Sequence, residues 1–385
     1  MKNFTFIDLF SWIWWFHQAM SLLWWTCVFA SEIDEYAIDT YKKNYWIDSN
    51  MDIKDVKVEE IPQHDVLCAW FPCQAFSKAW KRLWFQDETK WTLFFEIERI
   101  LKKHHTKYII LENVRNLVSH DNWNTWNTIY SHLKNIWYRL TPTPIILSPH
   151  NFWIPQLRER VVILWIYDPK NKDKDLIVDV SNLKNKDDND IYTIVSKEKV
   201  EDKYYITEKE KYILNAWDEF YKNIKEKVIW FPIRFDYFKK KSNESMPLRK
   251  KEFIKRNNDL YKNNKEFIDK WSKKYKSLKD FTPTQRKFEW QAWTSISSLW
   301  EWLIQFRPSW IRVKKPTCFP ALVALVQTPI IWRYGRRLTV NEAAKLQSFS
   351  NDFIPNKNDQ QAYKQLWNAV NVDVIKFAAE QLFQQ

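Results

Sequence analysis

The sequence predicts an α/β protein built around a mostly parallel sheet, with a smaller domain inserted into it. From Phe4 to about Tyr167, short apolar runs alternate with segments of helical periodicity, and this alternation is typical of βαβ units. From about Asp168 to Lys279 the chain is dense in Lys, Asp and Asn, as in solvated loops and exposed helices. Regular patterning returns near the C-terminus, so we expect the last segment to rejoin the first domain.

Five apolar runs in the first part of the chain are the expected strands. They are Phe4–Phe10, Cys27–Ser31, Val66–Ala69, Tyr108–Leu111 and Val161–Ile166. Between the third and fourth runs, apolar residues of Thr92–Lys103 recur at helical spacing (Leu93, Ile97, Ile100 and Leu101). This segment is predicted to be the crossover helix that joins two parallel strands.

The rest of the chain gives the expected domain boundaries. Leu303–Arg307 and Phe319–Val326 are further predicted strands, a helix is expected from about Val340, and a closing helix from about Val372 to Leu382. We therefore predict a first domain at 1–167, an inserted domain at 168–330 whose part 168–280 is lysine-rich and partly loop, and a rejoining segment at 331–385.

The net charge of the chain favours a polyanionic partner. Its 385 residues contain 60 Lys and Arg against 47 Asp and Glu, which gives a net charge of +13 and an isoelectric point of about 9.3. A surplus of this size suits nucleic acid. AT-rich coding sequence also raises the lysine content, so the charge alone is weak support.

The cysteines and the N-terminal segment indicate a cytoplasmic protein. The four cysteines include no CxxC pair, so we expect neither a disulfide framework nor a zinc site, and no metal. The apolar stretch from Phe4 is interrupted by Asp8, His17 and Gln18. It therefore resembles neither a secretion signal nor the run of about 20 apolar residues that spans a bilayer. No membrane association is expected.

Glycine is almost missing, and tryptophan has taken its share. A chain of this length should contain on the order of 27 glycines, but it has one glycine, Gly335, and 25 tryptophans. Many tryptophans stand where a turn or close backbone approach is expected, as at Trp12, Trp14, Trp15, Trp137 and Trp153. At such positions glycine alone tolerates a positive φ without strain. By contrast, ordinary tryptophans are expected at Trp126, Trp217, Trp271, Trp290 and Trp300.

Our hypothesis is that the gene comes from a lineage that reads UGA as glycine and was translated with a table that reads UGA as tryptophan. Restoring about 20 glycines would bring the composition close to the usual share. The codons at Trp12, Trp14 and Trp15 decide the matter, because UGG at these positions would mean that the tryptophans are genuine.

Three segments near the N-terminus have the pattern of a nucleotide-type cofactor site. The first strand ends in the sequence from Asp8 to Phe16, which would be a glycine-rich turn into a helix if residues 12, 14 and 15 were glycine. Glu32 ends the second strand, where an acidic side chain often binds ribose hydroxyls; a surface carboxylate is the alternative. Asp52 is a candidate acceptor for an adenine amino group, or simply a turn residue.

The strongest local signal is Phe71-Pro72-Cys73-Gln74, directly after the strand Val66–Ala69. A cysteine at the carboxyl end of a parallel strand lies at the crevice where such sheets bind ligands, and it acts as a nucleophile when its thiolate is stabilised. The alternative, a buried free thiol, is our interpretation of Cys27, Cys68 and Cys318.

Glu112, Arg158 and Arg160 are the expected partners of this cysteine. Glu112 follows the strand Tyr108–Leu111, and in a water-poor pocket a carboxyl group keeps its proton and can donate it to a ring nitrogen. It could instead cap the next helix. Arg158 and Arg160 lie two positions apart, hence on one face of an extended segment. They suit a phosphate, a base carbonyl or the catalytic carboxylate, although surface arginines would show the same spacing.

These blocks, in this order, resemble the DNA cytosine-5 methyltransferase family of bacterial restriction-modification systems. The series continues with Arg336-Arg337-Leu338-Thr339, Gln347 and Phe349, and ends with Leu366-Trp367-Asn368-Ala369-Val370. The resemblance covers roughly the first 165 and the last 55 residues. The family typically has glycine at positions 12, 14, 15, 70 and 367, where this chain has tryptophan.

The resemblance implies a Rossmann-like S-adenosylmethionine-dependent methyltransferase domain with an inserted target-recognition domain, and it implies roles for individual residues. Cys73 would be the nucleophile that adds to cytosine C6, Glu112 would act at N3, and Arg158 and Arg160 would give electrostatic support. The implied S-adenosylmethionine site consists of Phe10, Ser11, Trp12, Ile13, Trp14, Glu32, Ile33, Asp52, Ile53, Pro72, Asn368 and Val370. The implied DNA contacts are Gln74, Ser77, Gln156 and Arg336.

The implied reaction is methyl transfer to C5 of a cytosine flipped out of double-stranded DNA, by a monomer whose cognate restriction endonuclease acts separately. One alternative is an RNA cytosine-5 methyltransferase acting on transfer RNA; the long insertion between about 168 and 330 favours duplex DNA instead. The other alternative is a catalytically dead DNA-binding protein, since a genuine indole at Trp12 or Trp14 would fill the methionine pocket.

Overall fold

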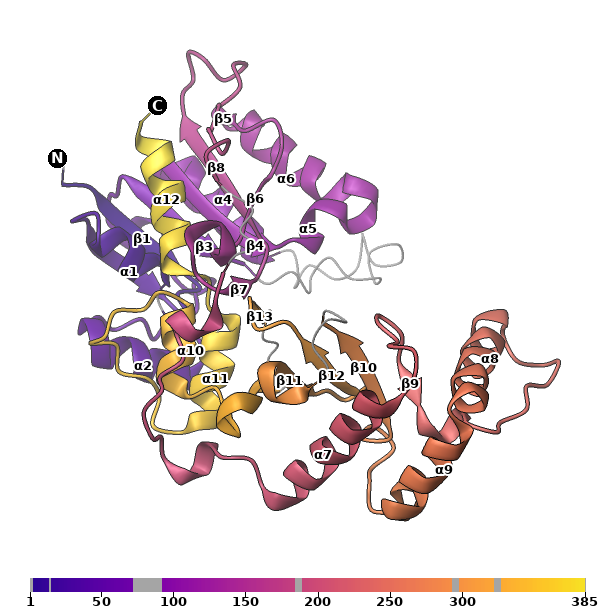
Figure 1. The fold of residues 1–385 in the computed structure, drawn as a ribbon. Coiled ribbons are helices and arrows are strands. Elements are labelled where there is room, and N and C mark those ends of the chain that lie inside the picture. Colours follow the sequence, from indigo (N-terminus) through magenta and orange to yellow (C-terminus); the bar gives the residue numbers. More distant parts are fainter. Residues whose placement is uncertain are drawn as a thin grey trace. The chain divides into compact units, whose positions relative to one another are not determined.

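The computed structural model describes residues 3–13, 15–71, 92–183, 189–292, 298–321 and 327–384. The chain forms two compact units. Unit 1 comprises Met1–Asn189 and Val340–Gln385, and unit 2 comprises Asp190–Thr339. Unit 1 is therefore built from the two ends of the chain, which are the indigo to magenta and the yellow segments of Figure 1.

Unit 1 contains a seven-stranded sheet in which β2, β1, β3 and β4 are parallel neighbours, followed by β8 and β5, while β6 also pairs with β8. Its strands are β1 (Thr5–Leu9), β2 (Thr26–Ser31), β3 (Val66–Trp70), β4 (Tyr108–Val114), β5 (Tyr138–Leu140), β6 (Ile145–Leu147) and β8 (Arg160–Tyr167), and the short β7 (Gln156–Leu157) precedes β8. The α/β class with a mostly parallel sheet is confirmed. The strand expected at Val161–Ile166 runs antiparallel to β4, however, because the chain reverses between β6 and β8 without a crossover helix, and β5 and β6 both pair antiparallel with β8.

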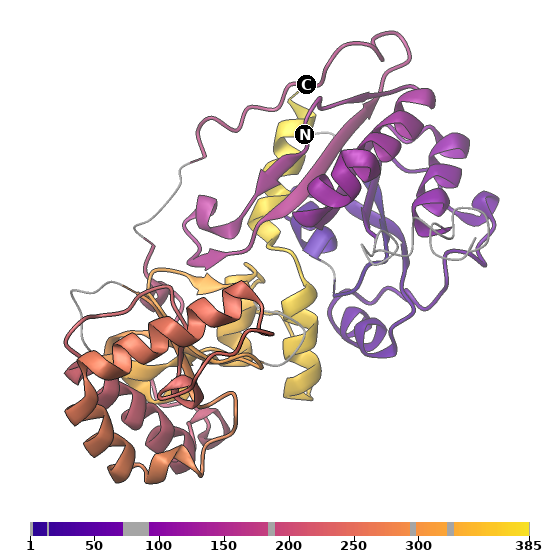
Figure 2. The same ribbon diagram turned by 90° about the vertical axis from the view of Figure 1, so that its right-hand side faces the viewer.

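Helices cover both faces of this sheet (Figures 1 and 2). They are α1 (Trp15–Ser21), α2 (Glu35–Tyr45), α4 (Thr92–His104), α5 (Asn116–Ser119), α6 (Asn124–Asn135), α10 (Val340–Leu346), α11 (Asp359–Asn368) and α12 (Val372–Phe383). Alternate strand residues such as Leu67, Ile109 and Ile163 pack with Ile97 of α4 and Leu133 of α6 in one apolar core. The period of two along each strand sends the other residues to the opposite face.

The opposite face of the sheet carries Glu112. Tyr108, which has the same parity as Glu112 along β4, contacts Phe383 of α12 with ring centroids 4.3 Å apart. Glu112 lies opposite Trp70, the last residue of β3, in the parallel register and opposite Val162 in the antiparallel one. The sheet thus brings Glu112 beside the strand end that leads to Phe71 and Pro72.

Unit 2 has its own sheet, in the order β15, β14, β11, β12, β10, β9. The strands of this unit are β9 (Ile233–Arg234), β10 (Lys287–Gln291), β11 (Leu303–Phe306), β12 (Ile311–Lys314), β13 (Phe319–Pro320), β14 (Ile330–Ile331) and β15 (Arg336–Arg337), and its helices are α7 (Glu208–Asn223), α8 (Leu248–Asn263) and α9 (Lys265–Lys274). Trp217 of α7 and Trp271 of α9 lie in its apolar core. Of the strand expected at Phe319–Val326, the part beyond Ala321 lies outside the described residues.

The unit boundaries differ from the predicted ones. Unit 2 begins at Asp190 rather than 168 and ends at Thr339 rather than 330. The segment after β8 has no helix or strand of its own up to Leu183, yet it belongs to unit 1 because Leu176 is buried and its N–H donates to the carbonyl of Leu140 at 2.8 Å. Composition marked this segment as loop, and a single buried leucine was not enough to assign it to the first domain.

Among the described residues, 16 non-glycine residues have a positive φ, and seven of them are tryptophans. They are Trp12, Trp24, Trp46, Trp123, Trp137, Trp153 and Trp230. Trp46 ends α2 in the left-handed conformation, with its N–H bonded to the carbonyl of Lys42, and its side chain is 88% exposed. The left-handed conformation costs a residue with a Cβ about 1–2 kcal/mol, and glycine is its usual occupant at the end of a helix.

A second group of tryptophans is buried without a partner for the indole N–H. Among the described residues, Trp15, Trp165, Trp332 and Trp367 leave this donor without a hydrogen bond, which costs about 1–3 kcal/mol for a neutral buried group. Trp217 and Trp271, both expected to be ordinary tryptophans, instead donate to the carbonyls of Gln285 and Ala216 at 2.8 Å. The tryptophans with a positive φ and those with an unbonded indole N–H both carry a free-energy cost that glycine at the same positions would not have.

Across the residues that the structure describes, no helix combines the length and the apolar character needed to cross a membrane.

Candidate active site

A completely buried carboxyl group lies at the carboxyl end of β4. Oε1 of Glu112 is 3.0 Å from Nε of Arg160, but the arginine N–H does not point along this line. Neither carboxyl oxygen has a hydrogen bond within the described part of the chain. Burial raises the pKa of Glu112 to about 7, although the charges of Arg160 and Arg158 oppose the rise. The group can therefore hold or release a proton near neutral pH.

The two arginines come from the segment that leads into β8. The backbone N–H of Arg158 donates to Oγ of Ser148 at 2.9 Å, and the side chain of Arg158 is buried. Arg160 lies opposite Val114 in the β4–β8 register. Both guanidinium groups act electrostatically on Glu112, so the predicted cluster of Glu112, Arg158 and Arg160 does assemble. Burial lowers the pKa of both arginines, and Glu112 opposes that shift.

Asn113 ties this cluster to the end of β3. Its side-chain Nδ2 donates to the carbonyl of Phe71 at 2.8 Å, and its Oδ1 accepts from the N–H of Val114 at 2.9 Å. Asn113 is completely buried, so both bonds are protected from water. Phe71 is the last described residue before Pro72, and its position is thereby coupled to that of Glu112.

At the carboxyl ends of β1 and β2, Glu32 organises the neighbouring backbone. Its Oε2 accepts from the N–H of Trp12 at 2.9 Å, and its Oε1 accepts from the N–H groups of Ile33 at 2.8 Å and Asp34 at 2.9 Å. The backbone of Ser11 donates to the carbonyl of Ser31 at 3.0 Å. Burial raises the pKa of Glu32, and the three hydrogen bonds oppose that rise.

The other predicted cofactor residues of this region differ in their exposure. Ile33 is 69% exposed although it follows a buried strand. Ile53 is buried, and Asp52 accepts from the backbone N–H of Lys54 at 3.0 Å. The hydroxyl of Ser11 is buried and has no hydrogen-bond partner among the described residues.

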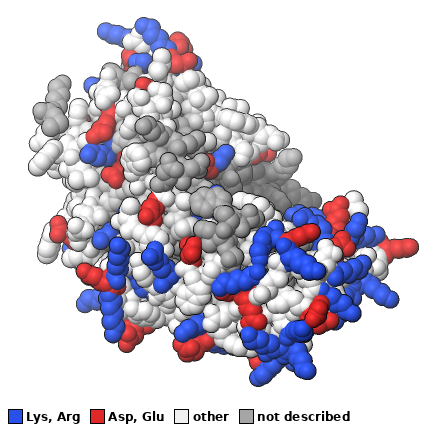
Figure 3. Space-filling view, in the orientation of Figure 1, with Lys and Arg blue, Asp and Glu red and all other residues white. Residues whose placement is uncertain are grey.

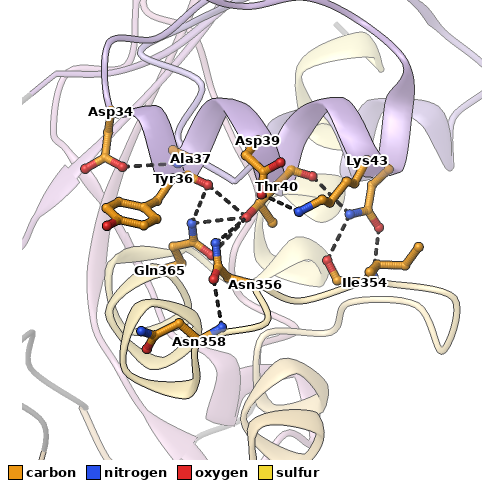
Figure 4. A network of polar contacts seen from close by, with 11 residues as sticks. Asp34, Tyr36, Ala37, Asp39, Thr40, Lys43, Ile354, Asn356, Asn358 and Gln365 are labelled. Atoms are coloured by element: carbon orange, nitrogen blue, oxygen red, sulfur yellow. Dashed lines mark hydrogen bonds and ion pairs between the residues drawn. The ribbon is translucent and has the colours of Figure 1, made fainter.

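The C-terminal helix α11 is held against α2 by a polar network (Figure 4). Nε2 of Gln365 donates to the carbonyl of Tyr36 at 2.8 Å and to Oγ1 of Thr40 at 3.2 Å. The side chain of Asn44 exchanges two hydrogen bonds with the backbone of Ile354, at 2.9 and 2.8 Å. These contacts join α2 to Gln365 of α11 and to Ile354 in the segment before α11.

Comparison with known proteins identifies this arrangement. The family model of the C-5 cytosine-specific DNA methylases matches residues 4–384. The chain belongs to this family.

The methylase is similar to several type II methyltransferases. It is 29% identical to M.AluI of Cellulosimicrobium cellulans over 97% of this chain and 91% of that protein. It is 44% identical to M.HpaII of Haemophilus parainfluenzae over 42% of this chain and 46% of that protein, and 38% identical to M.HhaI of Haemophilus parahaemolyticus over 43% and 49%. The methylase is accordingly a DNA cytosine-5 methyltransferase of the restriction-modification type, which transfers a methyl group from S-adenosylmethionine to C5 of cytosine in DNA.

Solved structures agree on the fold. A methyltransferase of Entamoeba histolytica, EhMeth, superposes with a TM-score of 0.54 at 16% identity over 100% of this chain and 99% of that one. The S. pombe Dnmt2 methyltransferase gives the same values. At this identity the likeness concerns the fold alone, and it agrees with the predicted methyltransferase architecture.

Several predicted site residues of the methylase lie outside the described residues, namely Pro72, Cys73, Gln74, Ser77 and Trp14. Among the described ones, Phe10, Ser11, Trp12, Ile13, Glu32 and Ile33 gather around the ends of β1 and β2. Gln156 is buried and accepts from Gln347 at 3.0 Å. Nε2 of Gln156 and Oε1 of Gln347 are buried and have no hydrogen bond within the described residues, and a DNA contact by Gln156 stays a prediction.

Arg336 has a structural environment in unit 2. It is 1% exposed, and its guanidinium donates to the carbonyls of Arg337 at 3.0 Å and Ser196 at 2.8 Å. These contacts tie Arg336 to the backbone of unit 2, and a DNA contact by Arg336 stays a prediction.

The residues around Glu32 fit S-adenosylmethionine in part. Glu32 and Asp52 supply acceptors for hydroxyl and amino groups, Ile33 supplies an apolar surface for a flat ring, and the unpartnered hydroxyl of Ser11 suits a polar group. Trp12 does not fit. Its indole N–H donates to the carbonyl of Gln365 at 3.0 Å, and so the ring spans from the β1 turn to α11, the two segments that the family resemblance assigns to the cofactor.

Asn113, Gln365 and Thr40 were not singled out as supporting residues by the sequence. Asn113 directly follows Glu112. Its amide side chain, next to the apolar run Tyr108–Leu111, was the feature of the sequence that could have marked it as a supporting residue. Gln365 and Thr40 lie on helix faces that turn inward, and a polar residue on a buried face is visible only once the partner helix is known.

Proposed function

We propose that the methylase acts through a covalent adduct between the Cys73 thiolate and C6 of a cytosine flipped out of double-stranded DNA. The observation that supports this most is the state of Glu112. A carboxyl group with a pKa near 7, buried beside an arginine at 3.0 Å, is suited to give a proton to the ring nitrogen N3.

The first step forms the S–C6 bond. The thiolate electron pair adds to C6, the C5=C6 π electrons are displaced through the ring, and N3 takes the proton of Glu112. Once N3 carries this proton, the ring has a C4=C5 enamine that is nucleophilic at C5, and N3 returns the proton to Glu112 as C5 takes the methyl group and the C4=N3 bond is restored. Arg160 and Arg158 stabilise the carboxylate that remains when the proton is on the base.

The cofactor supplies one thing, an electrophilic methyl group on a sulfonium centre. Glu32, Ile33, Asp52, Ile53, Phe10, Asn368 and Val370 are the residues that we propose hold it. After C5 is methylated, a base removes the C5 proton, the electrons restore the C5=C6 bond, and the thiolate leaves. The thiolate is regenerated, so the cysteine is ready for another cycle.

Double-stranded DNA is the proposed substrate form, because the reacting carbons are buried in the stacked helix and must be exposed by flipping the base. Flipping costs a few kcal/mol, and contacts from the inserted unit 2 would offset it. We further propose that the enzyme works as a cytoplasmic monomer, separately from a restriction endonuclease, as the type II names of its relatives suggest.

A mechanism-based trap tests the adduct. A duplex with 5-fluorocytosine at the methylated position blocks removal of the C5 substituent, so the protein with glycine at positions 12, 14 and 15 should give a complex stable to denaturing electrophoresis in the presence of S-adenosylmethionine. The same protein with Cys73→Ser should bind the cofactor with unchanged affinity and form no such complex. A Cys73→Ser protein that still crosslinks or still methylates would refute the proposal.

A further inference from the structure

Charge is concentrated in one short part of unit 2. Between Lys239 and Lys279 there are 15 Lys and Arg against five Asp and Glu, a net charge of +10 out of +13 for the whole chain. Figure 3 shows these side chains gathered over the region of α8 and α9. An AT-rich gene raises the lysine content along the whole chain. It does not explain why most of the excess of Lys and Arg over Asp and Glu falls within these 41 residues.

The cations at the start of α8 are costly for the helix. Its first turn holds Arg249, Lys250 and Lys251 and no acidic residue. Positive charges beside the positive end of a helix dipole destabilise it, by up to about 1 kcal/mol each. Arg249 and Lys250 are exposed, and no ion pair joins any of the three to another described residue. A feature that works against stability points to a function.

Two stacked phenylalanines hold arginines beside this turn. Phe231 and Phe253 are stacked, with centroids 5.3 Å apart. The guanidinium of Arg256 lies 4.0 Å above Phe231, and those of Arg234 and Arg249 lie 5.4 and 5.9 Å from Phe253. None of the three forms an ion pair with the rest of the described chain, so their charges are not neutralised. Packing on rings restricts the side chains before a ligand arrives, and a guanidinium matches the geometry of a phosphate group.

We propose that Arg234, Arg249, Lys250 and Arg256 form a binding surface for the phosphate backbone of duplex DNA that flanks the methylated site. This surface lies outside every block that carries the family resemblance, and its groups recognise phosphate rather than bases. It extends the footprint of the enzyme along the duplex and adds salt-dependent affinity. The inference rests on the proposed substrate, double-stranded DNA, and concerns where that substrate is held.

The experiment uses the protein with glycine at positions 12, 14 and 15 and compares two duplexes that carry the same site, one with long and one with short flanks. The Arg249→Gln/Lys250→Gln/Arg256→Gln triple variant should raise the KM for the long duplex by on the order of tenfold, and much less for the short one. Its log Kd against log salt should have a slope smaller by about 2–3, since each lost phosphate contact removes about one. Lys250→Glu, at an exposed residue without contacts, should change KM in the same direction without affecting folding.

The control removes the same charge elsewhere. Lys170, Lys172 and Lys174 lie in the loop after β8, and none of them contacts an aromatic ring or forms an ion pair within the described residues. The triple Gln variant at these positions should therefore leave both KM values and the salt slope unchanged. Equal behaviour of the two triple variants, or a Lys250→Glu variant with an unaltered long-duplex KM, would overturn the inference. Tighter binding to RNA duplex than to DNA would also overturn it. Absence of methylation on either duplex by the parent enzyme would count against the proposed function instead.

Discussion

Nε of Arg160 lies 3.0 Å from Oε1 of Glu112, with the carboxyl group completely buried and the guanidinium only slightly exposed. Burial of Glu112 favours its protonated form, whereas the positive charge of Arg160 favours the carboxylate. This balance leaves the pKa near 7, which is where a group that must both give and take back a proton is most effective.

Glu112→Gln removes the proton but keeps the size of the side chain. In the protein with glycine at positions 12, 14 and 15, we expect this substitution to lower kcat by on the order of 10²–10⁴ and to leave the Kd for S-adenosylmethionine unchanged, since Glu112 is not among the groups around Glu32. Single-turnover methylation and calorimetry measure the two quantities. A variant with nearly normal kcat would mean that N3 is protonated by another group.

The pH dependence of kcat should follow the titration of Glu112. Its protonated form is lost as the pH rises through about 7, so kcat should decline on the alkaline side. Arg160→Met removes a positive charge that lowers the pKa of Glu112, and therefore this decline should move to higher pH. Profiles of both proteins from about pH 6 to about pH 9 make the comparison. A decline at the same or lower pH in Arg160→Met would contradict the assignment.

Stability should respond to pH in the same window. Between the ordinary carboxyl pKa of 4.5 and the raised value of about 7, folded Glu112 keeps a proton that the unfolded chain releases. The free energy of unfolding therefore falls as the pH rises through this interval. Glu112→Gln should flatten that part of the curve in denaturant titrations at several pH values; an identical slope in both proteins would show that Glu112 titrates normally.

Much of the fold follows from residue patterns that the structure keeps. The strand at Tyr108–Leu111 and the helix at Thr92–Lys103 were readable because their periodicity is strong, and the observed elements extend them by a few residues at most. The boundary at Asp190 was not readable, because it depends on Leu176 docking on β5 rather than on local composition. The direction of β8 was not readable either, since strand pairing is a tertiary property.

The cluster of Glu112, Arg158 and Arg160 was only partly predictable. Spacing put Arg158 and Arg160 on one face, and strand ends put Glu112 near them, so the chain itself encodes this group. The roles of Asn113 and Gln365 depend on partners far away in sequence, Phe71 and Tyr36, and no local pattern specifies such pairs.

Replacing left-handed tryptophans with glycine should stabilise the protein. Trp46→Gly and Trp153→Gly relieve about 1–2 kcal/mol of strain each, which exceeds the roughly 0.4–1 kcal/mol that extra freedom of the unfolded chain costs. We expect a net gain of about 1 kcal/mol for each in denaturant unfolding. Trp217→Gly, at a buried and hydrogen-bonded tryptophan, should instead lose at least about 3–5 kcal/mol. Destabilisation by all three substitutions would indicate that the tryptophans are native.

Replacing the tryptophans at the proposed cofactor site with glycine should restore binding of S-adenosylmethionine. The indole of Trp12 reaches the carbonyl of Gln365, so the Trp12→Gly/Trp14→Gly/Trp15→Gly variant should remove that ring and allow the backbone turn to approach a ligand. We expect calorimetry to detect binding of S-adenosylmethionine by this variant and none by the chain with tryptophan at these positions. Trp46→Gly serves as the control, because it gains stability without changing the turn. Equal cofactor affinity in the chain with Trp12 and in the triple variant would show that the indole leaves the site open, and UGG codons at the three positions would then assign tryptophan to the natural protein.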